Sequence, residues 1–221
     1  MLSILKSAAK GVMPPFAWYG LRLMLRMVGL VQDPPKKDKA ALFGGDDVLF
    51  KSAFEGATVY GEYGVGASTI WVAEQHSIPM IGVDSSREWI DHVSSRIENT
   101  DWHPRYVDIG PLANWGYPKC HAMRHNYGAY SESLWDGDLS PDLVLVDGRF
   151  RVACFLTTLL RAAPGTKIIF DDYADRPLYH LVEEFCPPSA RSYRQALFVV
   201  PHNLDRAAIE KTRDAFTMVI D

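Results

Sequence analysis

The sequence predicts an α/β fold, a mostly parallel sheet of about seven strands with helices on both faces. Two observations predict it. From residue 58 onward, short apolar runs alternate with segments of helical character, and five of these runs end at an acidic residue. Strands that alternate with helices are joined by right-handed crossovers and build a parallel sheet, so the acidic strand ends are expected at one edge.

Length and charge limit the functions that this fold could serve. The 221 residues, 48% of them hydrophobic, suffice for one large domain with a buried core. Residues 1–32 carry four basic and no acidic side chains, which leaves 19 basic and 27 acidic side chains, a balance of −8, in the rest. A body this acidic is not expected to bind nucleic acid, because phosphate contacts need clustered Lys and Arg.

Cysteine usage and hydropathy indicate a cytoplasmic protein. The three cysteines lie more than thirty residues apart and include no CxxC pair, which favours a reducing compartment. No charge-free apolar stretch approaches the roughly 18 residues that span a bilayer. Prolines and arginines interrupt the apolar residues at the start, so a secretory signal is not expected.

Residues 1–31 are predicted to form a basic amphipathic helical segment. Arg22 and Arg26 lie four residues apart on one helical face, with apolar side chains on another. Two interpretations stay open: the helix packs on its own domain or on a dimer partner, or it lies on the inner face of an anionic membrane. Residues 32–39, with two prolines and three lysines, read as a linker. The folded domain is expected over residues 40–221.

A strand followed by a glycine turn opens the domain. The run from Thr58 ends near Glu62, Gly64 and Gly66 form the turn, and a helix begins around Ser68. Glycine lets the backbone approach a ligand closely, and the first amides of the helix point toward whatever occupies the turn. The next apolar strand ends at Asp84, about twenty residues on, where an acid can accept hydrogen bonds from both ribose hydroxyls.

Three nucleotide-type ligands compete for this turn. A phosphate-binding P-loop is excluded, because no GK[ST] ending follows the glycines. The dinucleotide pattern GxGxxG fails at its last position, where Thr69 stands. The string from Glu62 to Gly66, EYGVG, resembles the E/D-x-G-x-G motif of class I S-adenosylmethionine-dependent methyltransferases. A glycine turn without any ligand stays the remaining alternative.

The resemblance implies a Rossmann-like class I methyltransferase sheet and a set of cofactor contacts. Glu62 would lie beside the methionine portion of S-adenosylmethionine, the glycines would face its sugar, and Asp108 would lie near the adenine. With the residues already discussed, the expected cofactor-binding set is Glu62, Gly64, Gly66, Ser68, Asp84 and Asp108.

The remaining elements follow in order along the chain. A third strand is expected to end at Asp108, a fourth at Asp147 and a fifth at Asp171 and Asp172. Helices are expected between and after them, at residues 87–97, 151–162 and 177–185. The runs YRQALFVV and AFTMVI near the end could supply the two closing strands.

Asp147, Asp171 and Asp172 are predicted to hold a divalent metal ion. Three clustered carboxylates repel one another unless a cation balances them, and oxygen ligands suit Mg²⁺. The layout resembles the metal-dependent O-methyltransferases of the catechol and macrocin types, which implies that the ion binds and acidifies the acceptor hydroxyl. Two alternatives stay open: Asp147 caps the next helix, and Asp172 pairs with Arg176.

The predicted catalytic residues are Asp147, through the metal, and His180 as a base. The catechol type has a lysine base three residues after its first metal acid, but Phe150 stands there, between Arg149 and Arg151. A guanidinium is too basic to abstract protons, whereas imidazole titrates near neutrality. The alternative is that His180 is simply a helix residue with its hydrogen bonds satisfied.

An aromatic segment is inserted between the third and fourth strands. Trp115, Tyr117, Tyr127, Tyr130 and Trp135 could form an acceptor wall or lid, or pack as a flap over the sheet. The same segment holds His121 and His125, a spacing that binds zinc on a helix. It lacks the Glu of HExxH and is rich in Gly, Pro and Ser, which favours a loop without metal.

The leading hypothesis from the sequence is an S-adenosylmethionine-dependent O-methyltransferase acting on a hydroxylated small molecule or a sugar. The alternative from another class is a non-catalytic module of the same fold that docks, through residues 1–31, to a membrane or to a partner in glycan assembly. An NAD-type Rossmann oxidoreductase is disfavoured by Glu62 and by the missing third glycine.

Overall fold

The computed structural model describes residues 41–98 and 101–221. The amphipathic segment predicted at residues 1–31 and the linker predicted at 32–39 lie outside these described residues. Within the described ranges, no helix is both long and apolar enough to cross a membrane.

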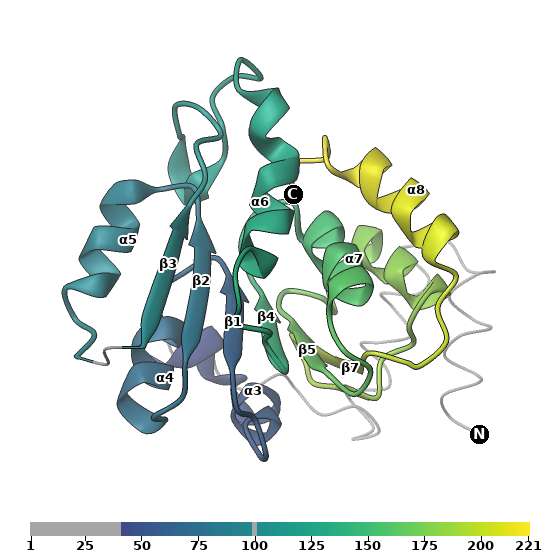
Figure 1. Ribbon diagram of the computed structural model, residues 1–221, viewed down its shortest axis with the longest axis horizontal. Coiled ribbons are helices and arrows are strands. Elements are labelled where there is room, and N and C mark those ends of the chain that lie inside the picture. Colours follow the sequence, from purple (N-terminus) through teal and green to yellow (C-terminus); the bar gives the residue numbers. More distant parts are fainter. Residues whose placement is uncertain (1–40, 99–100) are drawn as a thin grey trace, which may run out of the picture. The chain divides into compact units, whose positions relative to one another are not determined.

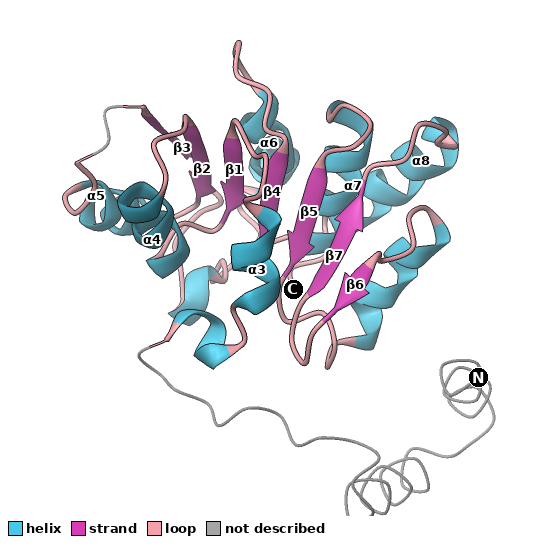
Figure 2. Ribbon diagram, turned by 90° about the horizontal axis from the view of Figure 1, so that it is seen from below, coloured by secondary structure: helices cyan, strands magenta, loops and turns pink. Residues whose placement is uncertain are grey.

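The described residues form one seven-stranded sheet with the order β3-β2-β1-β4-β5-β7-β6 (Figures 1 and 2). The five strands β1 to β5 are parallel, β7 runs antiparallel to β5, and β6 runs antiparallel to β7. The mostly parallel sheet is therefore confirmed. The strands are β1 (Tyr60–Tyr63), β2 (Met80–Asp84), β3 (Trp102–Tyr106), β4 (Leu143–Val146), β5 (Lys167–Phe170), β6 (Ala190–Arg191) and β7 (Ala196–Val199).

Helices cover both faces of the sheet, as the sequence predicts. Figure 2 shows α3, α4 and α5 on one face and α6, α7 and α8 on the other. The α-helices are α3 (Val48–Ala53), α4 (Ala67–Gln75), α5 (Arg87–Ser94), α6 (Tyr127–Glu132), α7 (Arg151–Arg161) and α8 (Arg206–Phe216). Short 3₁₀ helices connect them: η1 (Leu42–Gly45), η2 (Asn114–Gly116), η3 (Arg124–Asn126), η4 (Ser133–Trp135) and η5 (Pro177–Glu184).

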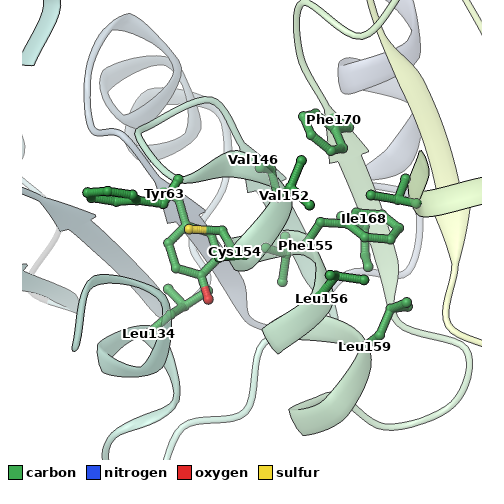
Figure 3. Close-up of a cluster of buried hydrophobic side chains, with 14 of the residues drawn as sticks. Tyr63, Leu134, Val146, Val152, Cys154, Phe155, Leu156, Leu159, Ile168 and Phe170 are labelled. Carbon is green, nitrogen blue, oxygen red and sulfur yellow. The ribbon is translucent and has the colours of Figure 1, made fainter. Parts of the chain in front are cut away.

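The central strand β4 is buried on both faces, which is why it reads as a continuous apolar run. Successive side chains point to opposite faces of a strand. Val144 and Val146 therefore pack against α7, and Figure 3 shows Val146 in that cluster. Leu143 and Leu145 join the opposite cluster, which contains Phe50 of α3. This rigid centre carries the strand ends that form the candidate site.

One of the predicted elements is wrong in type. AFTMVI is not a strand, because its first two residues end α8 and the following residues form a turn without strand pairing. The first turn of α8 is capped where the Asp205 carboxylate accepts a hydrogen bond from the Ala208 amide at 3.1 Å. The seventh strand is instead the short β6. The segment predicted as a helix at residues 177–185 is the 3₁₀ helix η5, with Pro177 in its first turn.

Candidate functional site

A cleft of about 960 Å³ opens at the carboxyl ends of β1, β2 and β4. Its walls include residues 64–68 after β1, 84–86 at the end of β2 and 147–149 after β4. Chain connectivity reverses direction between β1 and β4, because β2 and β3 continue to one side and β5 to the other. Ligands bind at such switch points in open α/β sheets, so the cleft is the candidate active site.

The two glycines of the turn have different roles. Gly64 has a φ of +89°, and a Cβ atom there would lie 2.6 Å from the Gly148 Cα atom. Gly66 has an extended φ of 177°, and a Cβ atom there would meet only Trp89 Nε1, at 3.9 Å. Gly66 therefore leaves open space in the cleft, whereas Gly64 permits close packing of two turns.

Asp84 lies in the cleft with part of its hydrogen-bonding capacity unused. One carboxylate oxygen accepts from the Val65 amide at 3.2 Å and the other from the Ser86 amide at 2.8 Å. The Ser85 amide also interacts with this carboxylate. A carboxylate can accept about four hydrogen bonds, so acceptor capacity remains for a ligand. Burial raises the pKa of Asp84, while these backbone amides oppose the rise.

Glu62 is fully buried beneath the glycine turn and is not among the residues that line the cleft. Its Oε2 accepts hydrogen bonds from the Ser68 hydroxyl at 2.9 Å and the Tyr60 hydroxyl at 3.0 Å. Ser68 does line the cleft, but its hydroxyl is directed to Glu62. Burial raises the pKa of Glu62 from 4.5 to about 7, against opposing hydrogen bonds from Thr69, Ser68 and Tyr60. The acid thus supports the turn from below.

Trp89 is a cleft residue that the sequence analysis did not identify. It stands in the first turn of α5, and its Nε1 donates to the Val65 carbonyl oxygen at 2.6 Å. The side chain lines the cleft and is about half exposed. It fixes the glycine turn from the neighbouring βα unit. Its partner is 24 residues away along the chain, so no local pattern indicates the contact.

Asp108 and His180 do not line the cleft. Strand β3 ends at Tyr106, which leaves Asp108 in an exposed loop, where its carboxylate accepts from the Gly110 amide at 2.9 Å. His180 lies with its ring against Tyr173 and its Nε2 at 3.0 Å from the Tyr173 carbonyl oxygen. Both side chains are therefore engaged outside the region where the other predicted residues meet.

The residues of the aromatic segment divide between the cleft wall and the packed interior. Trp115, Tyr117 and Tyr130 line the cleft, whereas Tyr127 is buried and Trp135 donates a hydrogen bond to the Tyr63 hydroxyl at 3.0 Å. Trp115 sits at the tip of a hairpin with a φ of 63° and is 88% exposed.

The histidine pair in this segment does not form a metal cluster. Residues 120–123 are irregular, and η3 begins only at Arg124. Within the described ranges, the metal-type cluster of His, Cys, Asp and Glu side chains is the aspartate group after β4 and β5.

Asp147, Asp171 and Asp172 come together as predicted, with candidate ligand oxygens within 4.8 Å of one another. Arginine side chains, however, contact these carboxylates. Arg151 Nη2 lies 2.9 Å from an Asp147 oxygen, and Arg176 Nη2 lies 2.8 Å from an Asp172 oxygen. The pairing of Asp172 with Arg176 that the sequence left open is therefore confirmed.

Arg194, from the hairpin between β6 and β7, completes the charge balance. Its Nε lies 2.8 Å from each oxygen of the fully buried Asp171, and its Nη2 lies 3.0 Å from an Asp172 oxygen. Gln195 adds a hydrogen bond from its amide to Asp171 at 3.1 Å. No local sequence pattern indicates Arg194, which lies 23 residues from Asp171 along the chain.

This arrangement does not fit a divalent ion. Three carboxylates are already matched by three guanidinium groups, and Arg cannot be deprotonated in a protein. A dication would have to displace guanidinium groups before it could reach the oxygens. The three aspartates are therefore not assigned as metal ligands.

Phe150, which stands where the catechol type has its lysine base, is also inaccessible from the cleft. Phe150 is fully buried with a left-handed φ of 53°, and its ring packs against Tyr127 and Tyr130 at 4.8 and 5.6 Å. Arg149, which precedes it, lines the cleft with its guanidinium 4.4 Å from the centre of the Tyr117 ring. Among the predicted catalytic residues, Asp147 alone has access to the cleft.

Comparison with known proteins identifies the family. No family model and no curated protein matches the chain. A solved structure of a methyltransferase-like protein from Silicibacter pomeroyi is 31% identical, with a TM-score of 0.71, and the match covers 85% of this chain and 96% of that one. The N-methyltransferase NodS from Bradyrhizobium japonicum, solved with S-adenosylhomocysteine, shares only the fold, with 13% identity, a TM-score of 0.51 and coverage of 78% and 95%. The chain belongs to the class I family of S-adenosylmethionine-dependent methyltransferases.

Proposed function

We propose that the protein binds S-adenosylmethionine and transfers its methyl group to a hydroxyl oxygen of a small molecule or a sugar. One observation carries this proposal. The open space at Gly66, the spare acceptor positions of Asp84 and the carboxylate of Asp147 share one cleft at the switch point of the sheet.

The part of the cleft around Asp84 and Gly66, the cofactor half, suits a nucleoside. Asp84 offers carboxylate oxygens suited to paired ribose hydroxyls, and the absent side chain of Gly66 leaves room for the sugar. Trp89 and Glu62 hold this half in shape, one from α5 and the other from beneath the turn.

At the acceptor end of the cleft, around Asp147, a carboxylate is placed to take a proton. Asp147 lines the cleft with its side chain 27% exposed, while burial and the neighbouring Asp171 raise its pKa well above the ordinary value. A carboxylate with a raised pKa is a better general base near neutral pH. Arg151 holds Asp147 in place through its 2.9 Å contact.

The reaction then needs alignment and one proton transfer. S-adenosylmethionine supplies an electrophilic methyl group on a sulfonium sulfur. Asp84 and the turn at Gly66 would hold the cofactor; its methyl group would pass to the acceptor oxygen, with the electron pair of the carbon–sulfur bond remaining on sulfur, and the Asp147 carboxylate would take the hydroxyl proton. Holding the two reactants in line supplies much of the rate enhancement.

Calorimetry with S-adenosylhomocysteine tests the cofactor assignment. Asp84→Asn should weaken binding about tenfold or more, because a hydrogen bond to a charged group contributes about 1.5–3 kcal/mol. Asp91→Asn is the matched control, since Asp91 is an exposed acid of α5 outside the cleft. Tight binding of NAD with no binding of S-adenosylhomocysteine would contradict the proposal and favour the oxidoreductase interpretation.

Methyl transfer is tested with labelled S-adenosylmethionine and a panel of phenols, catechols and sugars. Transfer to a hydroxyl oxygen supports the proposal, and transfer to nitrogen or carbon contradicts its acceptor atom. Cofactor binding without transfer to any member of the panel favours the non-catalytic module.

A further inference from the structure

The charges at the acceptor end of the cleft are balanced within the protein. Asp147, Asp171 and Asp172 contribute three negative charges, and three arginines contact them at hydrogen-bonding distance; these arginines are Arg151, Arg176 and Arg194. Buried charges are tolerated when they are paired and hydrogen-bonded. Asp171 is fully buried and is paired with Arg194, and the Arg151 side chain is 4% exposed and is paired with Asp147. Both buried charges therefore meet this condition.

Arg194 bridges two of the three carboxylates. Its N–H groups contact both the Asp171 and the Asp172 carboxylate, at 2.8 and 3.0 Å, whereas Arg151 contacts the carboxylates of Asp147 and Asp172, at 2.9 and 3.4 Å. A bridging cation bound by two consecutive carboxylates would need the same oxygens. The planar guanidinium satisfies them with directed hydrogen bonds, which a spherical ion cannot do.

The backbone holds Arg194 in place. The carboxylate of Asp46 accepts from the Arg194 amide at 2.7 Å and from the Ser192 hydroxyl at 2.7 Å. Gln195, the next residue, bonds to Asp171. The residues on either side of Arg194 and its own backbone amide are therefore held by hydrogen bonds, as expected for a fixed part of the site.

We propose that Arg194 takes the place of a divalent ion in this site, so that the carboxylates bind guanidinium groups and methyl transfer requires no metal. The carboxylates bind guanidinium groups whatever reaction the protein catalyses, whereas metal-independent methyl transfer rests on the proposed function. Arg194 is a positioning residue, because it acts through Asp171 and Asp172.

The proposal predicts how the full-length wild-type protein responds to ions. Titration with Mn²⁺ or Mg²⁺ in a calorimeter should give no stoichiometric binding, and neither millimolar Mn²⁺ nor EDTA should shift the Tm. A stoichiometric site that Asp171→Asn removes would overturn the proposal.

Removal of Arg194 should create the missing ion site. Arg194→Gln leaves Asp171 buried without its counter-charge, so its Tm should fall, and millimolar Mn²⁺ should restore part of the loss. The double variant Arg194→Gln, Asp171→Asn should show no response to Mn²⁺. Arg161→Gln is the matched control, since it breaks an exposed pair with Glu132 and frees no carboxylate of the site.

A second variant covers the case in which Arg194→Gln does not fold. Arg176→Gln removes another guanidinium from Asp172 but leaves Asp171 paired, and Arg176 is 41% exposed. It should fold and show a smaller rise in Tm with Mn²⁺. Absence of a Mn²⁺ response in both variants would show that the arginines do not occupy an ion's position. Failure of S-adenosylhomocysteine to bind would contradict the proposed function. The ion titrations would still test whether the arginines exclude a metal ion.

Discussion

Gly64 and Gly148 face each other where the order of the strands reverses, so close that a Cβ atom on Gly148 would lie 2.8 Å from the Gly64 amide nitrogen. One follows β1 and the other follows β4, the two adjacent strands on which the cleft is centred. The absence of both side chains lets the two turns touch. At this point the lining of the cleft is backbone, and Gly64 is required for packing as well as for its positive φ.

Gly64→Ala should destabilise the protein strongly. The new Cβ atom would clash with Gly148, and alanine is strained at a φ of +89°. Strain and overpacking together are expected to cost on the order of 3 kcal/mol. Chemical denaturation measures this loss, and an unchanged free energy of unfolding would contradict the packing role.

Gly66→Ala is the contrasting change two residues away. Its φ suits any residue, and its Cβ atom would meet only Trp89 Nε1 at 3.9 Å. The free energy of unfolding should change by no more than about 0.5 kcal/mol, as for most substitutions that disturb no packing. Binding of S-adenosylhomocysteine should weaken, because the methyl group enters the cleft. Equal affinities of the variant and the wild type would show that no ligand approaches Gly66.

Glu62 should make the stability of the protein fall as the pH rises toward neutrality. Its pKa is raised from 4.5 in the unfolded chain to about 7, so the folded state binds the proton more tightly. The stabilisation is complete below pH 4.5 and is lost as the pH rises through 7, by about 3 kcal/mol for a shift of this size.

Glu62→Gln isolates this effect, because a neutral side chain of the same shape cannot titrate. Denaturation of both proteins between pH 4.5 and 8 gives the difference in their free energies of unfolding. That difference should change with pH in the stated direction. A difference that stays flat would mean that Glu62 is ionised in the folded protein throughout this range.

Asp147→Asn should slow methyl transfer with little effect on cofactor affinity. Loss of a general base typically costs a factor of about 10² to 10⁴ in rate. The amide can still accept a hydrogen bond from Arg151, so the fold should persist. Asp138→Asn, an exposed acid in the loop before β4, is the control. An equal kcat in variant and wild type, once an acceptor is found, would remove Asp147 from the mechanism.

Trp89→Phe should weaken cofactor binding by loosening the glycine turn. The variant keeps an aromatic ring but loses the 2.6 Å hydrogen bond to the Val65 carbonyl oxygen, which contributes about 1 kcal/mol. Trp102→Phe is the matched control, because it loses an Nε1 hydrogen bond to the Ser94 hydroxyl outside the cleft. Calorimetry should show a change in the affinity for S-adenosylhomocysteine only in the first variant.

The order of the elements could be predicted from the sequence because each strand is a short apolar run with its own turn signals. The acids that end β2 and follow β4 and β5 can be predicted for the same reason, since a parallel sheet brings such ends together. The prediction was less exact at β3, where an edge strand ends two residues before Asp108 and leaves it in a loop. Closing strands are also ambiguous, as AFTMVI shows.

The arginines show which parts of the site a sequence can indicate. Arg151 follows Asp147, and Arg176 follows Asp172, by four residues, a spacing that allows side-chain contact. It indicates the Asp172–Arg176 pair that the sequence leaves open, and it applies equally to the Asp147–Arg151 pair. Arg194 is 23 residues from Asp171 and reaches it from an antiparallel hairpin. Only the tertiary fold brings these two charges together, so a metal ion was the simplest cation to infer.

The contact between Asp46 and Arg194 also sets where a shortened version of this protein could begin. A chain starting at residue 48 would retain every described strand of the sheet, yet it would lose Leu42, Phe43 and Gly44 from the wall of the cleft. It would also lose the carboxylate that fixes the backbone of a charged residue 148 positions further on. Such a fragment could pass a test of folding and still fail one of activity, because the functional unit extends beyond the sheet that defines the fold.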